Sequence, residues 1–268
     1  MKPAWSIIIC SIDAGKFAQI SQCYERLLAG RPYEIIGIHD ARSLCEAYNR
    51  GVARARGEVL VFSHDDILIV DPGFADKIEA RLQTFDLLGF AGTVLLSDAY
   101  WWASGPQHMR GVVAHAAPGQ RQLSLFVYGV TQADVEPAQA LDGLCMIARR
   151  STLARQRFDE HRFDGFHLYD LDFSYSTHQL GMKVGVMTDI PILHYSAGVF
   201  GEDWRRYRRV FVEKHAATLG IDIHQPMQGP AQLKARAAEF QDLPALLAWW
   251  RKDYLRRASQ AFLTSLAK

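Results

Sequence analysis

Apolar and polar positions along the first third of the chain predict strands and helices in turn. Residues 5–12 (WSIIICSI) form an unbroken apolar run, as is typical of a strand buried on both faces of a parallel sheet. Residues 16–28 then repeat apolar side chains at helical spacing. The alternation continues with a buried strand at 33–40, a helix at 43–56, a strand at 58–62 and a helix from 74 to 85. Strands and helices in this order predict βαβ units and a parallel sheet.

The pattern changes between residues 91 and 140. Short apolar stretches there are separated by Gly, Pro and Ser turns, which predicts an antiparallel insertion or flap. Trp101 and Trp102 in this region are predicted to be an exposed pair. Strand patterns return at 183–187 and 190–194. The fold class is therefore α/β, with a mostly parallel central sheet flanked by helices and a small antiparallel flap.

The last part of the chain predicts helices. Residues 202–211 (EDWRRYRRVF) carry four arginines, and an apolar stripe runs through residues 245–263. We expect one α/β domain over residues 1–200 and a C-terminal helical extension over residues 201–268.

Composition narrows the class of protein further. The 268 residues are 49% hydrophobic and 22% charged, with 30 Lys plus Arg against 29 Asp plus Glu. These are ordinary globular values, and the charge balance gives no sign of a nucleic-acid partner. The four cysteines are scattered, so no disulfide framework is expected. The first apolar run is too short for a signal peptide, and no stretch is long enough to span a membrane, which predicts a cytoplasmic protein.

Groups able to hold a metal or move a proton follow the predicted strands. Ser63-His64-Asp65-Asp66 ends the strand at 58–62, and His194 ends the strand at 190–194. Ligands of parallel α/β sheets bind beyond the carboxyl ends of the strands. Hard divalent cations prefer carboxylate oxygens, and an imidazole can serve as a metal ligand or an acid/base. Residues 63–66 alone also fit a solvated polar turn, and His194 alone fits a structural histidine.

Asp170 and Asp172 form a third candidate cluster (HLYDLDFSYS). If this segment begins a helix, residues two apart point about 200° from each other, so both cannot face one site. One of the two is therefore predicted to be functional and the other structural. The dipole of the helix is expected to keep a functional Asp170 ionised at neutral pH.

Several familiar sites are absent from the sequence. No G-x-G-x-x-G follows the first strand, and there is no Walker A loop, no G-x-S-x-G elbow and no Cys/His zinc spacing. The pair His64-Asp65 fits the HD phosphohydrolase signature poorly, because that motif belongs to all-helical proteins.

The order of these motifs resembles the family-2 glycosyltransferases of GT-A fold. The resemblance covers roughly residues 5–200 and is most specific in YNRGVARARGEVLVFSHDDI and FDEHRFDGFHLYDLDFS. The sequence looks closest to the subgroup whose acidic motif reads hDD, which includes streptomycin-biosynthesis-type proteins. The resemblance implies a GT-A fold, a nucleotide-sugar donor, an acceptor hydroxyl, and Mn²⁺ or Mg²⁺ as cofactor.

The resemblance also assigns a metal site. Ser63 stands where the family has the first Asp of its Asp-x-Asp motif, and Asp65 occupies the second position. It implies that Asp65, Asp66 and His194 hold the metal, with His64 assisting at the donor. The missing first acid puts a strict metal requirement in question.

The remaining site residues are assigned in the same way. Asp170 matches the family's catalytic base, in an inverting transfer. The nucleotide-sugar pocket is implied to include Ser11, Asp13, Asp40, Asn49, Arg54, His64 and Asp65. On the acceptor side, flat aromatic rings that could stack on sugars, and a neighbouring turn, are contributed by Trp101, Trp102, Asp142 and Gly143.

Two other functions stay open at this point. A sugar-nucleotide nucleotidyltransferase shares a similar sheet, although it would normally have a Gly-rich basic loop after the first strand. A catalytically degenerate sugar-binding domain in polysaccharide assembly is the second, favoured slightly by Ser63.

The partners are also only partly defined. The acceptor is implied to be a glycan, a lipid-linked molecule or a protein, with no nucleic acid involved. Arg205, Arg206, Arg208 and Arg209 with the 245–263 helix predict peripheral contact with an anionic membrane, or else packing on the domain or a homodimer partner.

Overall fold

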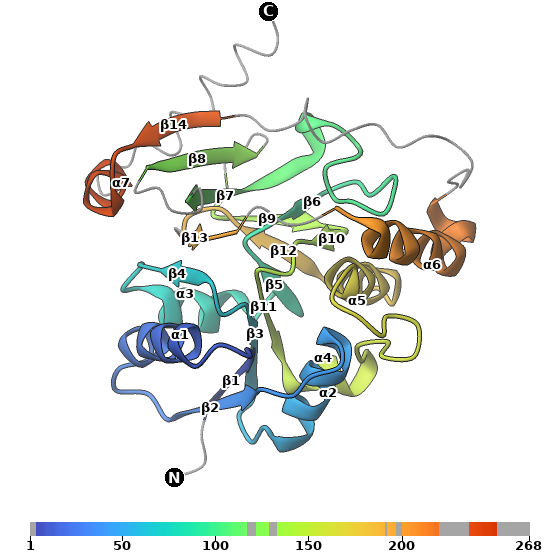
Figure 1. Cartoon of the computed structure of the whole chain (residues 1–268), viewed down its shortest axis with the longest axis horizontal. Coiled ribbons are helices and arrows are strands. Elements are labelled where there is room, and N and C mark those ends of the chain that lie inside the picture. Colours follow the sequence, from blue (N-terminus) through green and yellow to red (C-terminus); the bar gives the residue numbers. More distant parts are fainter. Residues whose placement is uncertain are drawn as a thin grey trace, which may run out of the picture.

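The computed structural model describes residues 4–116, 122–128, 133–190, 192–196, 200–219 and 236–250. Within these residues the strands form two seven-stranded sheets (Figure 1). In spatial order the first sheet contains β2 (Tyr33–Ile38), β1 (Trp5–Cys10), β3 (Val59–Ser63), β11 (Cys145–Arg149), β5 (Leu87–Gly89), β12 (Val184–Met187) and β9 (Val135–Ala138). Only β11 and β9 run against the others, so this central sheet is mostly parallel, as predicted.

Helices cover both faces of the first sheet. Figure 1 shows α1 (Ala14–Leu27) and α3 (Phe74–Arg81) on one side, with α2 (Leu44–Arg54), α4 (Arg150–Arg155) and α5 (Tyr169–Gln179) on the other. The Asp13 side chain caps α1 by accepting from the backbone N–H of Gly15 and Lys16, and Ser43 caps α2 in the same way. The apolar run of β1 is explained by this layering, because Ile7, Ile8 and Ile9 are fully buried.

The second strand differs from its prediction. β2 is the edge strand of the first sheet and its residues are mostly half-buried. The pattern YEIIGI resembles a buried strand because one face packs on the core, while the free edge leaves the other side partly open.

The predicted flap is part of a larger second sheet. Its main path is β10 (Ala140–Leu141), β6 (Ala91–Thr93), β7 (Met109–Ala116), β13 (Ile192–His194) and β4 (Ile67–Ile69), and β8 (Leu123–Tyr128) pairs with β7. A short 3₁₀ helix, η1 (Pro106–His108), precedes β7. Residues 63–66 and His194 follow predicted strands, from which we expect one sheet with both groups at its edge; this expectation is wrong. β13 lies in the second sheet, where it pairs with β4 and β7.

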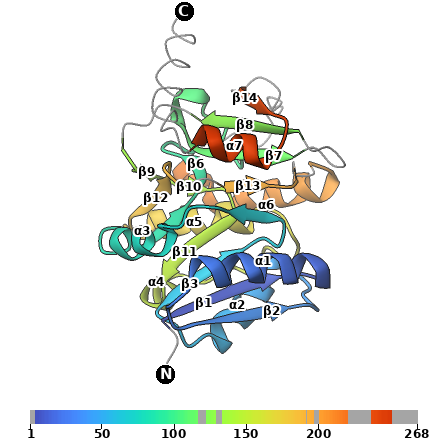
Figure 2. The same cartoon turned by 90° about the vertical axis from the view of Figure 1, so that its left-hand side faces the viewer.

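The C-terminal part contains helices, as the sequence pattern predicts. It also contains one strand, which the pattern does not predict. α6 (Glu202–Leu219) packs on the main core through Trp204, Tyr207 and Phe211. β14 (Arg236–Phe240) extends the second sheet beside β8, and α7 (Leu243–Trp250) packs beside them, as Figure 2 shows. The predicted 245–263 helix lies outside the described residues beyond position 250. The division at residue 200 stays a prediction.

The four arginines of α6 do not form one free basic patch. The Arg208 guanidinium is buried and binds the Asp98 carboxylate at 2.8 Å, and Arg206 binds Asp164 at 3.0 Å. Among the described residues, no helix combines the length and hydropathy that crossing a bilayer would need.

Candidate active site

The chain passes from one sheet to the other at the places where the candidate residues lie. Residues 64–66 connect β3 of the first sheet to β4 of the second, and residues 142–144 connect β10 of the second sheet to β11 of the first. A backbone hydrogen bond of 3.1 Å, from the N–H of His64 to the carbonyl oxygen of Leu144, holds the two crossings together. The polar residues of both crossings therefore lie together where the two sheets meet, and we call this place the seam.

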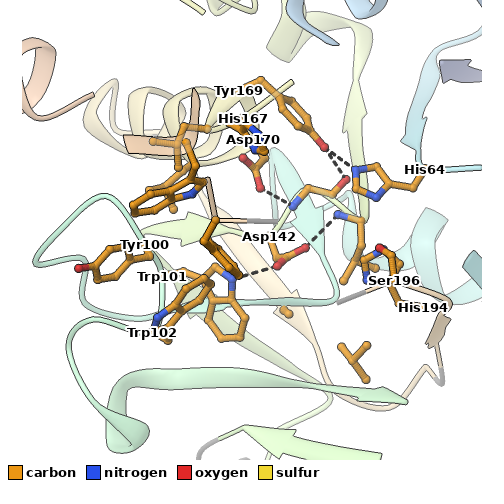
Figure 3. A pocket seen from close by; sticks show the side chains of 18 of the residues that line it. His64, Tyr100, Trp101, Trp102, Asp142, His167, Tyr169, Asp170, His194 and Ser196 are labelled. Atoms are coloured by element: carbon orange, nitrogen blue, oxygen red, sulfur yellow. Dashed lines mark hydrogen bonds between the residues drawn. The ribbon is translucent and has the colours of Figure 1, made fainter. Parts of the chain in front are cut away.

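A cavity of about 470 Å³ opens at this seam. Its size falls in the range of small-molecule sites. Figure 3 shows Asp142 and Asp170 between an aromatic group on one side and His64, His194 and Ser196 on the other. The cavity therefore has a reactive end, which contains these carboxyl and imidazole groups, and an aromatic end.

His64 and His194 at the reactive end, together with Asp66 behind them, could hold a metal ion. One ligand atom from each of His64, Asp66 and His194 lies within 4.8 Å of the others. The Asp66 Oδ1 atom is 3.4 Å from Nε2 of His194 and 3.8 Å from Nδ1 of His64. Two imidazoles and one carboxylate form a donor set that suits a divalent transition metal better than Mg²⁺, which favours oxygen ligands.

Hydrogen bonds and burial prepare these three groups for a cation. The Tyr169 hydroxyl donates to the carbonyl oxygen of Gly143 (3.2 Å) and therefore accepts from Nε2–H of His64 (2.7 Å), which leaves Nδ1 of His64 facing Asp66. Burial, together with neighbouring His194, lowers the pKa of His64, so its ring is neutral at pH 7. Burial alone would raise the pKa of Asp66, but its hydrogen bond to His194 and the nearby imidazoles outweigh burial and hold it well below its usual value.

Asp170 lies in the first turn of α5 and lines the cavity. Its Oδ2 atom accepts from the backbone N–H of Gly143 at 2.7 Å. Asp172, two residues on, is fully buried and pairs with Lys214 and His215 at 2.8 Å each. The sequence expectation that only one of the two carboxylates faces the site is confirmed, and Asp170 is the one that does.

The start of α5 is strained where it positions Asp170. Leu168 has φ 59° and ψ 10°, and among the described residues it is the one non-glycine residue with a positive φ. This left-handed conformation costs free energy for a residue with a side chain and is kept only where the surroundings fix it. Here it turns the chain abruptly, so that Tyr169 and Asp170 both face the seam.

The charge state of Asp170 differs from the sequence expectation. Burial, reinforced by the nearby Asp142 carboxylate, raises the pKa of Asp170 to about 7. Backbone N–H groups of α5 and Gly143 lower it, but less than burial raises it. The helix dipole therefore does not hold this group fully ionised at neutral pH. A carboxyl group with a pKa near 7 is poised to exchange a proton.

This raised pKa leads to a prediction about stability. A carboxyl group whose pKa is higher in the folded than in the unfolded protein stabilises the fold below its unfolded pKa, and that contribution is lost as pH rises through the folded pKa. Asp170→Asn should therefore be more stable than the wild type at pH 8, by up to about 4 kcal/mol, with the gain vanishing near pH 4. Thermal denaturation across this range measures it, with Glu25→Gln, exposed on α1, as the control. A gain independent of pH would contradict the assignment.

Gly143 is required by the close packing around these groups. A Cβ atom at this position would lie 2.2 Å from the Tyr169 hydroxyl and 2.7 Å from Cβ of Asp170. A side chain here would push α5 away from the seam.

The aromatic residues of the acceptor side differ from prediction in their exposure. Trp101 is buried and Trp102 is half-buried, because other aromatic rings pack on them. Tyr128 of β8 meets Trp101, and Tyr100 and Phe200 meet Trp102. The indole N–H of Trp101 donates to Oδ2 of Asp142 at 3.0 Å, and both tryptophans line the cavity. The four acceptor-side residues of the sequence prediction are therefore brought together.

Except for His64, the donor-side residues lie apart from the cavity. The Ser11 hydroxyl donates to Oδ2 of Asp65 at 2.6 Å, beside the capping Asp13. Exposed Asp40 pairs with Arg50 at 2.8 Å, and the hydrogen bond from Arg50 is the main cause of its lowered pKa. The remaining two residues lie on α2.

Of these two, Asn49 donates from its amide to the carbonyl oxygen of Phe158 at 2.9 Å, so it braces the loop before α5. Arg54 is exposed at the last turn of α2.

Ser63 does not line the cavity. It is fully buried at the end of β3, and its hydroxyl donates to the carbonyl oxygen of His64 at 2.8 Å. Asp65 also lies outside the group formed by His64, Asp66 and His194, because its carboxylate is held by Ser11.

Several lining residues had no sequence signal strong enough to single them out. Tyr169 connects His64 to Gly143, which only the folded structure reveals. His115 pairs with His194 across neighbouring strands, which only the register between β7 and β13 reveals. Ser196 lies 2.9 Å from the His194 ring, and Trp204 enters the cavity from α6.

Comparison with known proteins gives the family. The sequence pattern of the group described as "Glycosyltransferase like family" matches residues 6–215, which include both crossings, α5 and most of α6. The chain belongs to this family. No curated protein matches the chain.

A solved glycosyltransferase structure shares the fold of this family member. A mannosyltransferase from Pyrobaculum calidifontis, PcManGT, in complex with GDP-Man and Mn²⁺, aligns over 100% of this chain and 76% of its own, with TM-score 0.50 and 12% identity. GalNAc-T7, with UDP, GalNAc and Mn²⁺, aligns over 99% of this chain with TM-score 0.49 and 10% identity. The chain spans 57% of the GalNAc-T7 chain. At these identities the likeness to PcManGT supports the GT-A fold alone.

Proposed function

We propose that this protein transfers a sugar from a nucleotide-sugar donor to an acceptor hydroxyl. The observation that carries the proposal is that Asp170, His64 and His194 line one cavity, while the Asp66 carboxylate lies against both imidazoles. Membership of a glycosyltransferase-like family supports sugar transfer, and these groups supply the two kinds of chemistry that such a transfer needs. The complex of PcManGT with GDP-Man and Mn²⁺ supports the donor class.

Asp170 is the base in the proposed reaction. The acceptor hydroxyl gives its proton to the Asp170 carboxylate as its oxygen bonds to the anomeric carbon of the donor sugar. The bond from that carbon to the diphosphate oxygen breaks, and the electron pair leaves with the nucleoside diphosphate. Attack from the face opposite the leaving group makes the transfer inverting. A pKa near 7 suits the role, because the carboxylate form is populated and the proton is held once transferred.

The donor set fits a divalent metal. His64, Asp66 and His194 would hold it, through the Nδ1 atom of His64, the Asp66 carboxylate and the Nε2 atom of His194. The bound metal would supply positive charge for the diphosphate as that group gains negative charge. The two imidazoles favour Mn²⁺ over Mg²⁺. In this arrangement Asp65 is a donor-side residue held by Ser11, in place of the metal ligand that the sequence motif implies.

The nucleotide is proposed to bind at the carboxyl ends of β1, β2 and β3. Ser11 and Asp65 are joined there, and Asp40 lies beside Arg50 at the start of the next connection. Parallel α/β sheets bind ligands at such ends. The acceptor enters from the other side, through the cavity lined by Trp101, Trp102 and Asp142.

Finer aspects of the sequence prediction remain proposals. These are the hDD subgroup, polysaccharide biosynthesis, the cytoplasmic location, a homodimer and a peripheral membrane contact. For that contact α6 has three exposed arginines, Arg205, Arg206 and Arg209.

The donor proposal predicts nucleotide-dependent stabilisation. One of UDP, GDP, CDP and TDP, at about 100 times its dissociation constant and with Mn²⁺, should stabilise the fold by about 2.7 kcal/mol. For a chain of this size that raises the melting temperature by roughly 5 °C. Thermal-shift measurements with and without Mn²⁺ test it. If none of the four shifts the melting temperature at millimolar concentration, the donor class is wrong.

The same nucleotide identifies the donors for a turnover assay. Release of that diphosphate from matching nucleotide-sugars supports a transferase. Binding without any turnover favours the degenerate sugar-binding domain, and release of inorganic pyrophosphate from sugar phosphate and nucleoside triphosphate favours a nucleotidyltransferase.

A further inference from the structure

The end of the cavity away from the imidazoles is built from aromatic rings. Figure 3 shows Tyr100, Trp101 and Trp102 on the opposite side of Asp142 from His64 and His194. We call this part the aromatic end, and its rings belong to Tyr100, Trp101, Trp102, Phe166, Phe200 and Trp204.

Packing between the rings makes the aromatic end a rigid wall. Tyr100 is stacked between Trp102, at 5.4 Å and 12°, and Trp204, at 5.3 Å and 22°. Trp102 meets Phe200 edge-on at 5.4 Å. Because rings from α6 and from the segment after β6 hold one another, a ligand that covers them meets a preformed surface and loses little affinity to ordering side chains.

The aromatic end offers a ligand few hydrogen bonds. The Trp101 indole N–H is already bound to Asp142. The Trp102 indole N–H and the Tyr100 hydroxyl have no hydrogen-bond partner, but both atoms are buried and expose almost no surface to a ligand. A sugar ring placed here would bury several hydroxyl groups without partners, which disfavours binding. An apolar group has no such requirement.

Two rings remain partly in water where the cavity meets solvent. Phe166 is 53% exposed and Phe200 39% exposed. Large apolar side chains that border a cavity and stay exposed favour a ligand that covers them, because removing apolar surface from water is favourable.

We propose that the acceptor is amphipathic. Its reacting hydroxyl lies at Asp170, and an apolar group attached close to that hydroxyl, an aryl ring or a short alkyl chain, fills the aromatic end. The inference rests on the proposed transfer for the role of the hydroxyl. The preference for an apolar group is a binding property that can be measured without a donor.

Calorimetric titration with three β-D-glucopyranosides tests the proposal. The phenyl and hexyl glucosides should bind at least about tenfold more tightly than the methyl glucoside, because only they can cover the aromatic end. Whether the phenyl or the hexyl glucoside binds more tightly tells whether the apolar group of the acceptor is a planar ring or a chain. Equal binding of all three, or no binding by any, overturns the proposal. Failure of the nucleotide experiment is separate, since no nucleotide is present here.

Variants locate the binding to the aromatic end. Trp102→Leu should remove most of the difference between the glucosides, and Phe166→Ala should reduce it several-fold without threatening the fold, because Phe166 is exposed. The control is Leu180→Ala, which removes a 48% exposed side chain at the end of α5 that does not line the cavity. A preference that persists in both aromatic variants, or that falls equally in the control, places the apolar group elsewhere and overturns the assignment.

Discussion

Asp170→Asn should lower the turnover number for sugar transfer by about 10³-fold, because general-base catalysis contributes about 10²–10⁴ in rate. An amide at this position can still accept the hydrogen bond that Asp170 takes from Gly143, but it cannot take up the acceptor proton. Nucleoside diphosphate binding should change by less than about threefold, since Asp170 lies on the acceptor side. Steady-state kinetics and the thermal shift with the preferred nucleotide measure the two effects.

Asp142→Asn is the discriminating variant for this assignment. Asp142 contributes to the raised pKa of Asp170, so its neutralisation should move the acidic limb of the activity profile to lower pH. Activity of the wild type should rise with pH through about 7, as Asp170 loses its proton. If Asp142→Asn abolishes transfer while Asp170→Asn keeps near-native turnover, Asp142 is the base and our assignment is wrong.

His194→Ala and Asp66→Asn should each weaken Mn²⁺ binding by at least about 100-fold. Loss of residues that merely support a metal ligand already costs 10–100-fold, and removal of a ligand itself should cost more. Titration of Mn²⁺ followed by electron paramagnetic resonance measures the affinity without any turnover. The stabilisation by nucleoside diphosphate that depends on Mn²⁺ should disappear in the same variants.

Asp65→Asn separates the two possible metal sites. The sequence motif implies that Asp65 is a ligand, whereas its carboxylate is held by the Ser11 hydroxyl at 2.6 Å, outside the His64–Asp66–His194 group. We expect Asp65→Asn to change Mn²⁺ affinity by less than about tenfold. A larger loss in Asp65→Asn than in His194→Ala would restore the motif-based site.

Mn²⁺ should also bind more tightly than Mg²⁺, because two of the three donor atoms are imidazole nitrogens. The same donor set explains why the first aspartate of the family motif is not needed here. Ser63 is buried at the end of β3, so an aspartate there would have to point into the core or displace the turn. His64, one position later, faces the cavity and supplies a ligand atom from the same turn.

The alternation of apolar runs determined the α/β class and the mostly parallel first sheet. Local patterns suffice to predict these elements. A strand buried on both faces, such as β1, is a continuous apolar run, and a helix buried on one face has apolar residues at helical spacing. The helical period also determined that Asp170 and Asp172 have different surroundings, since residues two apart on a helix point in nearly opposite directions.

Only the tertiary structure decided how the site is assembled. Whether β13 joins the first or the second sheet depends on pairing between segments far apart in the chain, and that pairing brings His194 beside Asp66 and His115. The pKa of Asp170 depends on how deeply it is buried and on Asp142, 28 positions away in the sequence. The aromatic end likewise combines residues 100–102 with Trp204 of α6. A linear pattern carries no information on such long-range contacts, because each side chain's environment is set by the packing of the whole fold.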